Sequence, residues 1–128
     1  EFIEFGWIDY KYYSELLSCA DIFLLLMKDN TENKARWPNK SGDYFAAGRL
    51  ILTNPIGELY SITKRFPKSF ICVDWNKESL VKSIIAWLNK NENSCLSGKQ
   101  NRDIAENYLS WQIKAKELAA FYYKILGH

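Results

Sequence analysis

Three short apolar runs, separated by segments with helical spacing, limit most strongly how this chain can fold. The runs are "DIFLLLM" (21–27), "LILT" (50–53) and "SFICVD" (69–74). Each has the length of a strand, and a continuous apolar run is typical of a strand that is covered on both faces. Because such strands alternate with helical segments, we expect an α/β domain with a parallel sheet and right-handed crossovers.

The segments around these runs predict the remaining elements. We expect a short strand at 2–5 that ends at Gly6, then helices over 10–20, from Pro38 to Gly48, over 57–66 and over 76–88. After a break at 91–98 that is rich in Ser, Asn and Gly, two further helices are expected at 99–109 and 110–126. Apolar stripes run along the helix 76–88, through Leu80, Val81, Ile84, Ile85 and Leu88, and along the last helix, through Trp111, Ala115, Leu118, Tyr122 and Ile125.

The composition fits one globular domain over residues 1–128. Hydrophobic residues make up 48% of the 128 residues, which is enough for one compact core, and no repeat or linker divides the chain. The net charge is only +2 and the lysines are dispersed, so the composition does not favour nucleic acid as a partner. Cys19, Cys72 and Cys95 form no CxxC motif, a usage typical of a reducing compartment, and we therefore expect a cytoplasmic protein.

The histidine content restricts the chemistry. The only histidine, His128, is the last residue. Without an internal histidine the chain has no Ser-His-Asp triad, no Cys-His pair and no histidine-based metal site. Any chemistry must therefore come from carboxylates, lysine or arginine, backbone amides or the substrate itself, and we expect neither a metal ion nor a bound cofactor.

A polar segment after the first buried strand, "RWPNKSGDYFAAG" (36–48), is the candidate site. In parallel sheets, ligands bind beyond the carboxyl ends of the strands. Lys40 and Asp43 share a face in the first turn of the predicted helix, where free N–H groups and the helix dipole suit phosphate. Lys40 would add a charge for a diphosphate, and Asp43 could accept hydrogen bonds from the ribose hydroxyls. On spacing alone, an ordinary first-turn acid beside a solvated lysine is the more common arrangement.

Each of three further residues, Arg36 and Trp37 before the predicted helix and Gly57 after the next strand, allows two interpretations. Arg36 could pair with phosphate in a bidentate manner or simply be exposed. Trp37 is expected to pack rather than to stack on a ligand. Gly57, in "NPIGE" (54–58), either lets a ligand approach the backbone or belongs to a plain turn between strand and helix.

The order of these features resembles the carboxyl-terminal half of GT-B-fold glycosyltransferases. The segments that carry the resemblance are "FIEFGWIDYKYYSELLSCADIFLLL", "RWPNKSGDYFAAGRLILTNPIGEL" and "ENYLSWQIKAKELAAFYYKIL". The chain is most similar to the large retaining group, glycosyl transferases group 1 or family 4-like, and "PNKSGDYFAAGRL" matches a subset with the pattern "P.K..EY.A.GkP". The resemblance covers nearly the whole chain and implies a partial GT-B carboxyl-terminal domain, with a Rossmann-like parallel sheet, flanking helices and carboxyl-terminal helices.

The resemblance also implies roles for individual residues. Asp43 stands where the family holds the ribose of the donor nucleotide, and Lys40 where a lysine faces the donor phosphates. The turn at Pro38 and Asn39 would approach the donor sugar, and Gly6-Trp7-Ile8 falls where the family meets the base. With Lys40 and Asp43 in the catalytic role, the predicted donor site is Gly6, Trp7, Ile8, Arg36, Pro38, Asn39, Lys40, Ser41, Asp43 and Gly57.

The function implied by the resemblance is the donor half of a metal-independent glycosyltransferase. It would transfer a sugar from a nucleotide diphosphate sugar to a polysaccharide, a glycolipid or a similar acceptor. The acceptor-binding domain and the first strands of the donor domain would precede this segment. We therefore expect the 128 residues alone to show no turnover and at most weak nucleotide binding. The full-length protein would be able to associate peripherally with the inner face of a membrane.

The chain also departs from the family pattern. Ala35 stands eight positions before Asp43, where many relatives have a first acid, although Glu32 or Asp29 could approach the site from the loop. This departure favours a rival hypothesis, a non-catalytic α/β interaction or regulatory module that has lost the donor site. A flavodoxin-like or phosphate-transfer domain fits less well, because "GWIDYKYY" contains neither a GxGxxG motif nor a P-loop.

Overall fold

A three-stranded parallel sheet forms the centre of the fold. The computed structural model describes residues 3–89 and 94–127. The strands β1 (Ile22–Leu25), β2 (Leu50–Thr53) and β3 (Phe70–Cys72) lie in the order β1-β2-β3. The predicted α/β class is confirmed: the sheet is parallel, helices flank it and the topology is that of a partial Rossmann-like fold.

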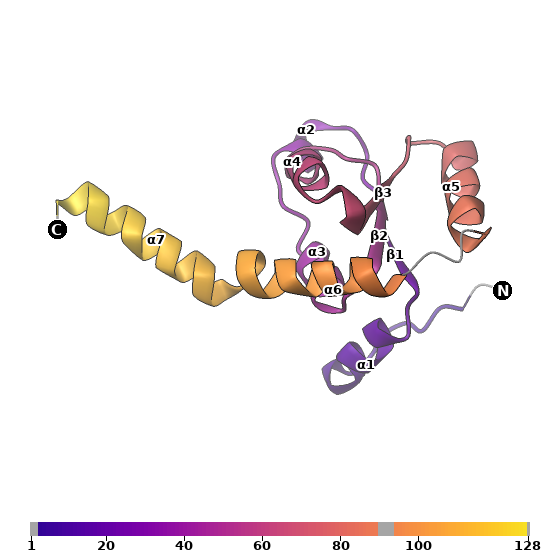
Figure 1. Ribbon diagram of the computed structural model, residues 1–128, viewed down its shortest axis with the longest axis horizontal. Helices are drawn as coiled ribbons and strands as arrows, with labels where there is room; N and C mark the ends of the chain where they lie inside the picture. Colours follow the sequence, from indigo (N-terminus) through magenta and orange to yellow (C-terminus); the bar gives the residue numbers. More distant parts are fainter. Residues whose placement is uncertain (1–2, 90–93, 128) are drawn as a thin grey trace.

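Helices connect the strands and cover them (Figure 1). In this view α4 and α5 lie on opposite sides of the sheet, and α7 runs away from it. The helical elements are η1 (Tyr10–Tyr12), α1 (Tyr13–Ser18), α2 (Thr31–Lys34), α3 (Lys40–Ala46), α4 (Glu58–Arg65), η2 (Pro67–Ser69), α5 (Lys77–Asn89), α6 (Ser94–Ile104), the π-helical turn η3 (Ala105–Leu109) and α7 (Trp111–Leu126).

The hydrophobic core lies on one face of the sheet. Phe23 of β1 pairs in register with Ile51 of β2, and Ile51 pairs with Phe70 of β3, so these three side chains share that face. Phe45 of α3 is fully buried and its ring meets Phe70 edge-on, with the ring centroids 5.5 Å apart. Five further residues complete the cluster: Leu25 of β1, Met27 just after it, Leu59 and Ile62 of α4, and Ile104 of α6.

The second face is covered only in part. Leu52 of β2 is fully buried, whereas Leu24, its partner in β1, is 49% exposed. The expectation that "DIFLLLM" is covered on both faces is therefore wrong at Leu24. Strand β1 lies at the end of the strand order, so its second face has fewer neighbours than that of β2.

Two further expectations about secondary structure are wrong. Residues 3–5, part of the strand predicted at 2–5, form no strand, and Phe2 lies outside the described residues. Ile3 and Phe5 are both 63% exposed, so this short segment gains no burial that would hold it in the sheet. The break predicted at 91–98 is also displaced: 94–98 belong to α6, and 91–93 lie outside the described residues.

The apolar stripes of α5 and α7 are largely exposed, although Leu80 and Ile84 of α5 are half-buried. Val81, Ile85 and Leu88 of α5 are 44–63% exposed, and no residue of α5 is buried. No residue of α7 is buried either. Within 3–89 and 94–127, no helix combines the length and the apolar character needed to cross a membrane.

Candidate functional site

The carboxyl ends of β1 and β2 are held together by buried polar side chains. Thr53 donates its hydroxyl hydrogen to the carbonyl oxygen of Leu25, at 2.7 Å. Asn54 accepts a hydrogen bond from the N–H of Met27 at 2.8 Å and donates one to the carbonyl oxygen of the same residue at 2.6 Å. The loop that begins at Lys28 therefore leaves the sheet from a fixed point.

This loop folds on itself before it reaches α3. Asn30 caps α2 by accepting a hydrogen bond from the N–H of Asn33, at 2.9 Å. Asn33 is buried and donates to the carbonyl oxygen of Lys28, at 2.8 Å. The ammonium of Lys34 lies 2.5 Å from the carboxylate of Asp29, and both side chains are exposed. An exposed pair of this kind contributes at most about 1 kcal/mol, so the buried amide of Asn33 is the firmer anchor.

The need for glycine at position 57 follows from a contact within the chain. Its φ of +57° lies in the left-handed region, and a Cβ at this position would stand 2.6 Å from the carbonyl oxygen of Lys34. The close approach that glycine permits here is made by the loop of residues 28–37. The turn at the start of α4 thus needs glycine whether or not a ligand binds.

At the start of α3, two of the backbone N–H groups are already hydrogen-bonded within the turn. The N–H and the hydroxyl of Ser41 both donate to the carbonyl oxygen of Pro38, and the N–H of Gly42 donates to that of Asn39. The Asn39 side chain makes no capping hydrogen bond. The helix predicted from Pro38 to Gly48 spans Lys40–Ala46.

Gly48 follows the end of α3 with a φ of +67° and donates its N–H to the carbonyl oxygen of Phe45, at 2.9 Å. This conformation confirms the predicted glycine at the carboxyl end of the helix.

The two cationic side chains near α3 are exposed, whereas the neighbouring tryptophan side chain is partly buried. Lys40 and Arg36 are exposed, and neither forms an ion pair in the described parts of the chain. Trp37 is half-buried and packs against the hydrophobic core, as predicted. Of these three side chains, the two cations are therefore free to meet a ligand.

Asp43 is the residue around which the site is built. Its carboxylate accepts a hydrogen bond of 3.0 Å from the hydroxyl of Tyr13 at the start of α1. Burial, the hydrogen bond and the charge of Asp43 together raise the pKa of Tyr13 to about 12. Burial, with a smaller effect from Asp43, also raises the pKa of Tyr44, whose ring stacks on Phe23 with the centroids 4.1 Å apart. Both phenols thus keep their protons at neutral pH.

Tyr13 was not among the site residues predicted from the sequence. The hydrogen bond joins residues that are 30 positions apart, so no local pattern shows it. The nearest signal is the crowding of tyrosines at 10, 12 and 13. In the structure the rings of Tyr10 and Tyr13 are stacked, with the centroids 6.1 Å apart.

The predicted base-binding segment lies just before this pair of tyrosines. Gly6 has a φ of +64° and Trp7 is 98% exposed, while Ile8 is half-buried. Asp9 then caps η1 by accepting a hydrogen bond from the N–H of Lys11 at 3.1 Å. Through η1, this segment leads directly to Tyr13 and so to Asp43.

The arrangement offers two kinds of ligand contact. A carboxylate has about four lone-pair positions, and Tyr13 uses one of those on Asp43. The others could accept hydrogen bonds from two hydroxyl groups. Lys40, one turn earlier on the same helix, could meet an anion. Within 3–89 and 94–127, no group of three or more His, Cys, Asp or Glu residues could hold a metal ion.

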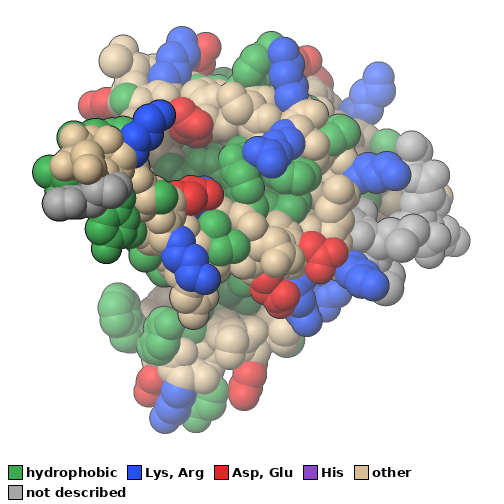
Figure 2. Space-filling view, turned by 60° about the vertical axis from the view of Figure 1, so that its left-hand side comes forward, with side chains coloured by type: hydrophobic (Ala, Val, Ile, Leu, Met, Phe, Trp, Pro, Cys, Tyr) green, Lys and Arg blue, Asp and Glu red, His purple; other side chains and the backbone are tan. Residues whose placement is uncertain are grey.

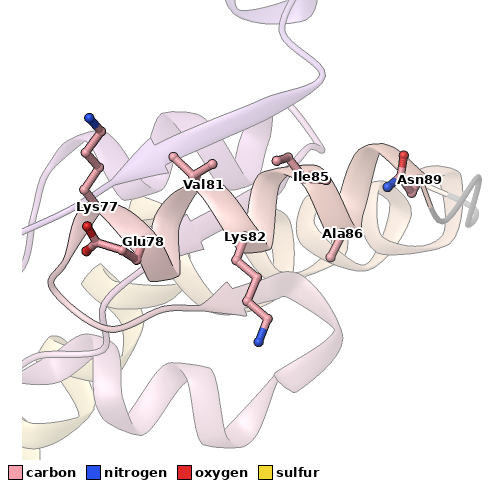
Figure 3. A pocket seen from close by; sticks show the side chains of 7 residues that line it. All are labelled: Lys77, Glu78, Val81, Lys82, Ile85, Ala86 and Asn89. Atoms are coloured by element: carbon pink, nitrogen blue, oxygen red, sulfur yellow. The ribbon is translucent and has the colours of Figure 1, made fainter.

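A hollow of about 670 Å³ lies elsewhere, along α5 (Figure 3). In this view Val81 and Lys82 point to opposite sides of the helix. None of the predicted donor-site residues lines this hollow. Its lining consists of Lys77, Glu78, Val81, Lys82, Ile85, Ala86 and Asn89.

The surface charges are mixed. Figure 2 shows acidic and basic side chains interspersed over the face in view, with apolar side chains between them. This agrees with the dispersed lysines and the net charge of +2.

Comparison of the chain with protein-family models, with curated proteins and with solved structures gives no match. The resemblance to glycosyltransferases therefore stays a prediction from the sequence motifs.

Proposed function

We propose that this chain is the donor-nucleotide-sugar-binding part of a cytoplasmic glycosyltransferase. The enzyme would transfer a sugar from a nucleotide diphosphate sugar to a polysaccharide, a glycolipid or a similar acceptor. The observation that supports this proposal best is the hydrogen bond between Tyr13 and Asp43. It joins α3, which carries Lys40 and Asp43, to the start of α1, which follows the predicted base-binding segment 6–8 through η1.

In the proposed complex, Asp43 accepts hydrogen bonds from the ribose hydroxyls while Tyr13 keeps its carboxylate in place. Lys40 faces the diphosphate, and the turn at Pro38 and Asn39 approaches the donor sugar. The exposed positions of Lys40 and Asp43 leave both side chains accessible to such a ligand. Gly57 takes no part in this version of the site, because its neighbour is the backbone of Lys34.

In sugar transfer, the bond between the anomeric carbon and the diphosphate oxygen breaks, and a bond to the acceptor oxygen forms. The acceptor hydroxyl gives its proton to water, and the nucleoside diphosphate leaves with one more negative charge. Lys40 would stabilise that charge electrostatically. The acceptor would be held by a domain that precedes this segment, so we expect no turnover from the 128 residues alone.

This proposal assigns no residue to the first acid of the family pattern. Ala35 ends α2 and offers no carboxylate. Asp29 is paired with Lys34, and Glu32 lies in the first turn of α2. Donor binding is therefore better supported than an acid-dependent catalytic step.

The experiment that tests the proposal is a titration of the labelled chain with UDP, GDP and ADP, followed by amide chemical shifts in NMR spectra. We expect shifts centred on residues 38–43 and on Tyr13. Lys40→Ala and Asp43→Ala should each weaken binding at least about tenfold, since a hydrogen bond to a charged group contributes about 1.5–3 kcal/mol. Lys68→Ala, which removes an exposed lysine of η2, is the matched control and should leave binding unchanged.

A second candidate function is supported by a different observation. The hollow along α5 and the exposed apolar stripe beside it are features of an interaction surface, and they lie apart from Asp43. A non-catalytic interaction module would show these features without a working donor site. In the NMR titration, saturating nucleotide without any shift at 38–43 would favour this second candidate.

A further inference from the structure

Helix α1, which carries Tyr13, lies at the edge of the molecule and is weakly packed. In Figure 1 it lies at the lower edge of the view, apart from α4 and α5. None of its residues is buried, and Leu17 packs against the hydrophobic core while it stays partly exposed. Because apolar burial gives α1 little support, its polar contacts determine how firmly it is placed.

Two side-chain hydrogen bonds tie α1 to α3 and to the segment that follows α3. At the start of α1, the hydroxyl of Tyr13 donates to the carboxylate of Asp43, at 3.0 Å. At the end of α1, Nη2 of Arg49 donates to the carbonyl oxygen of Ser18, at 2.9 Å. Asp43 lies in the first turn of α3, and Arg49 follows shortly after its end. The two helices are therefore tied at their corresponding ends.

Arg49 is itself held in place by α6. The side-chain amide of Asn101, which is fully buried, donates to the carbonyl oxygen of Arg49. Helix α6 also comes so close that a Cβ on Gly98 would stand 2.2 Å from the carbonyl oxygen of Gly48. The next residue after Arg49, Leu50, begins β2. The backbone from which the guanidinium reaches α1 is therefore fixed on two sides.

The guanidinium of Arg49 is turned inward. Its Nε is buried and forms no hydrogen bond in the described parts of the chain. A buried donor without a partner destabilises the folded state, so an arginine that served only solubility would gain by turning toward water. The bond to Ser18 accounts for the inward position. That carbonyl is among the last of α1, which lack partners within the helix, and a cation is favourable at this end of the helix dipole.

We propose that Arg49 is a positioning residue of the donor site. By holding the end of α1, it keeps the hydroxyl of Tyr13 on the carboxylate of Asp43, and it thereby fixes which lone pairs of that carboxylate are left for the ribose hydroxyls. Arg49 touches no part of the nucleotide and acts through α1 alone. This inference rests on the proposed function, because Asp43 must bind the ribose for the arrangement to affect a ligand.

The first measurement needs no nucleotide. The ring resonance of Tyr13 in a chain with labelled tyrosines, assigned by its loss in Tyr13→Phe, reports the ionisation of this residue. Arg49→Gln frees one end of α1, and the pKa of Tyr13 should fall from about 12 toward 10.0, because its burial and its hydrogen bond to Asp43 both weaken. Loss of a positive charge would by itself raise the pKa of a phenol, so a fall reports the movement of α1.

The matched control is Arg102→Gln. Arg102 is an exposed arginine of α6, beside Gly48, and it forms no ion pair within 3–89 and 94–127. Its replacement changes the net charge as Arg49→Gln does but removes no bond to α1. The ionisation of Tyr13 should therefore stay as it is in the unchanged chain.

The second measurement is the affinity for whichever of UDP, GDP and ADP shifts residues 38–43 most strongly. Arg49→Gln should weaken binding about fivefold, a usual size for a residue that acts on a site without touching the ligand. In a chain that already carries Tyr13→Phe, Arg49→Gln should add almost no further loss, because there is no hydroxyl left to position. Arg102→Gln should leave the affinity unchanged.

Arg49→Lys keeps the cation but not the planar fork of donors, so it should give a smaller change of the same sign in both measurements. Circular dichroism of each variant shows whether it folds. If Arg49→Gln does not fold, the comparison of Arg49→Lys with Arg102→Lys takes its place.

Two results would overturn the positioning role. The first is a Tyr13 that ionises as late in the Arg49 variants as in the unchanged chain. The second is a loss of affinity from Arg49→Gln that is equally large in the Tyr13→Phe chain, which would mean that Arg49 does not act through Tyr13. Failure of the donor site is a separate outcome: the unchanged chain would show no shift at 38–43 with any nucleotide, whereas the Tyr13 resonance would still show whether Arg49 places α1.

Discussion

The two faces of the sheet differ in how completely helices cover them. On the first face, Phe45 and Leu59 are fully buried against the sheet. On the second face, Leu52 is buried but its neighbour Leu24 is half exposed, and α5 buries no residue. Both faces are built from apolar strands and amphipathic helices. The difference teaches that an apolar stripe identifies a helix that needs a partner but does not identify the partner.

The same contrast separates the two functional proposals. The proposed donor site lies with the well-covered part, where buried polar groups such as Asn54 fix the loop that leads to α3. The exposed apolar side chains of α7 and the hollow along α5 lie in the sparsely covered part. A binding site for a small ligand needs fixed geometry, whereas a surface for a large partner needs exposed apolar area.

The largest effect is expected from a pair of core and surface substitutions. Phe45→Ala removes a fully buried ring that packs on Phe70, and it should lower the free energy of unfolding by about 3–5 kcal/mol. Ile85→Ala, on the exposed stripe of α5, should lower it by less than about 1 kcal/mol. Urea unfolding of both variants measures the difference. Equal losses would show that α5 is covered in solution and would break the comparison between the two faces.

An intermediate effect is expected from two glycines. Gly57→Ala places a Cβ against the backbone of Lys34 at positive φ, and it should destabilise the chain by about 2 kcal/mol or more. Gly42→Ala adds a Cβ inside α3, where no atom lies within 4 Å, and it should stabilise the chain by about 0.5–1 kcal/mol. The midpoint of thermal unfolding should therefore fall for Gly57→Ala and rise for Gly42→Ala. A midpoint that Gly57→Ala leaves unchanged or raises would contradict the close packing of the loop 28–37 on Gly57.

The sequence predicted correctly those element boundaries that depend only on the residues next to them. Strand β2 begins and ends where the run "LILT" does, because Arg49 and Asn54 bound it with polar side chains. The helix that starts at Pro38 was predicted to end at Gly48, because a helix that ends before a strand commonly needs a residue with positive φ, which glycine adopts easily. The segment 3–5 has the composition of a strand but pairs with nothing, because a strand also needs a neighbouring edge.

The candidate site was predicted only in its local part. The positions of Lys40 and Asp43 in the first turn of α3 follow from their spacing in the sequence. The partner of Asp43, Tyr13, could not be found in this way, because the chain brings the two residues together only after β1 and α1 have packed. For Gly57, the sequence left a ligand contact and a plain turn as alternatives, and the structure places the backbone of Lys34 beside this residue.

The smallest effect is expected at the hydrogen bond that joins α1 to α3. Tyr13→Phe should lower the free energy of unfolding by about 0.5–1.5 kcal/mol at neutral pH, the usual contribution of one hydrogen bond. The effect depends on pH with a definite sign. Because the folded state raises the pKa of Tyr13 from 10.0 to about 12, the proton is held more tightly there than in the unfolded chain. The stability due to this group is complete below pH 10 and is lost as the pH rises toward 12.

Alkaline titration followed by tyrosinate absorbance measures this directly. The unchanged chain should show two tyrosines, Tyr13 and Tyr44, that ionise later than the exposed ones, and Tyr13→Phe should remove the step contributed by Tyr13 alone. Tyr10→Phe, at the 87% exposed neighbour, is the matched control and should retain the step. Asp43→Asn should move the step to lower pH but not fully to 10.0, because burial, the largest cause of the shift, remains. A titration of Tyr13→Phe that matches the unchanged chain would mean that the hydrogen bond between Tyr13 and Asp43 does not join α1 to α3 in solution.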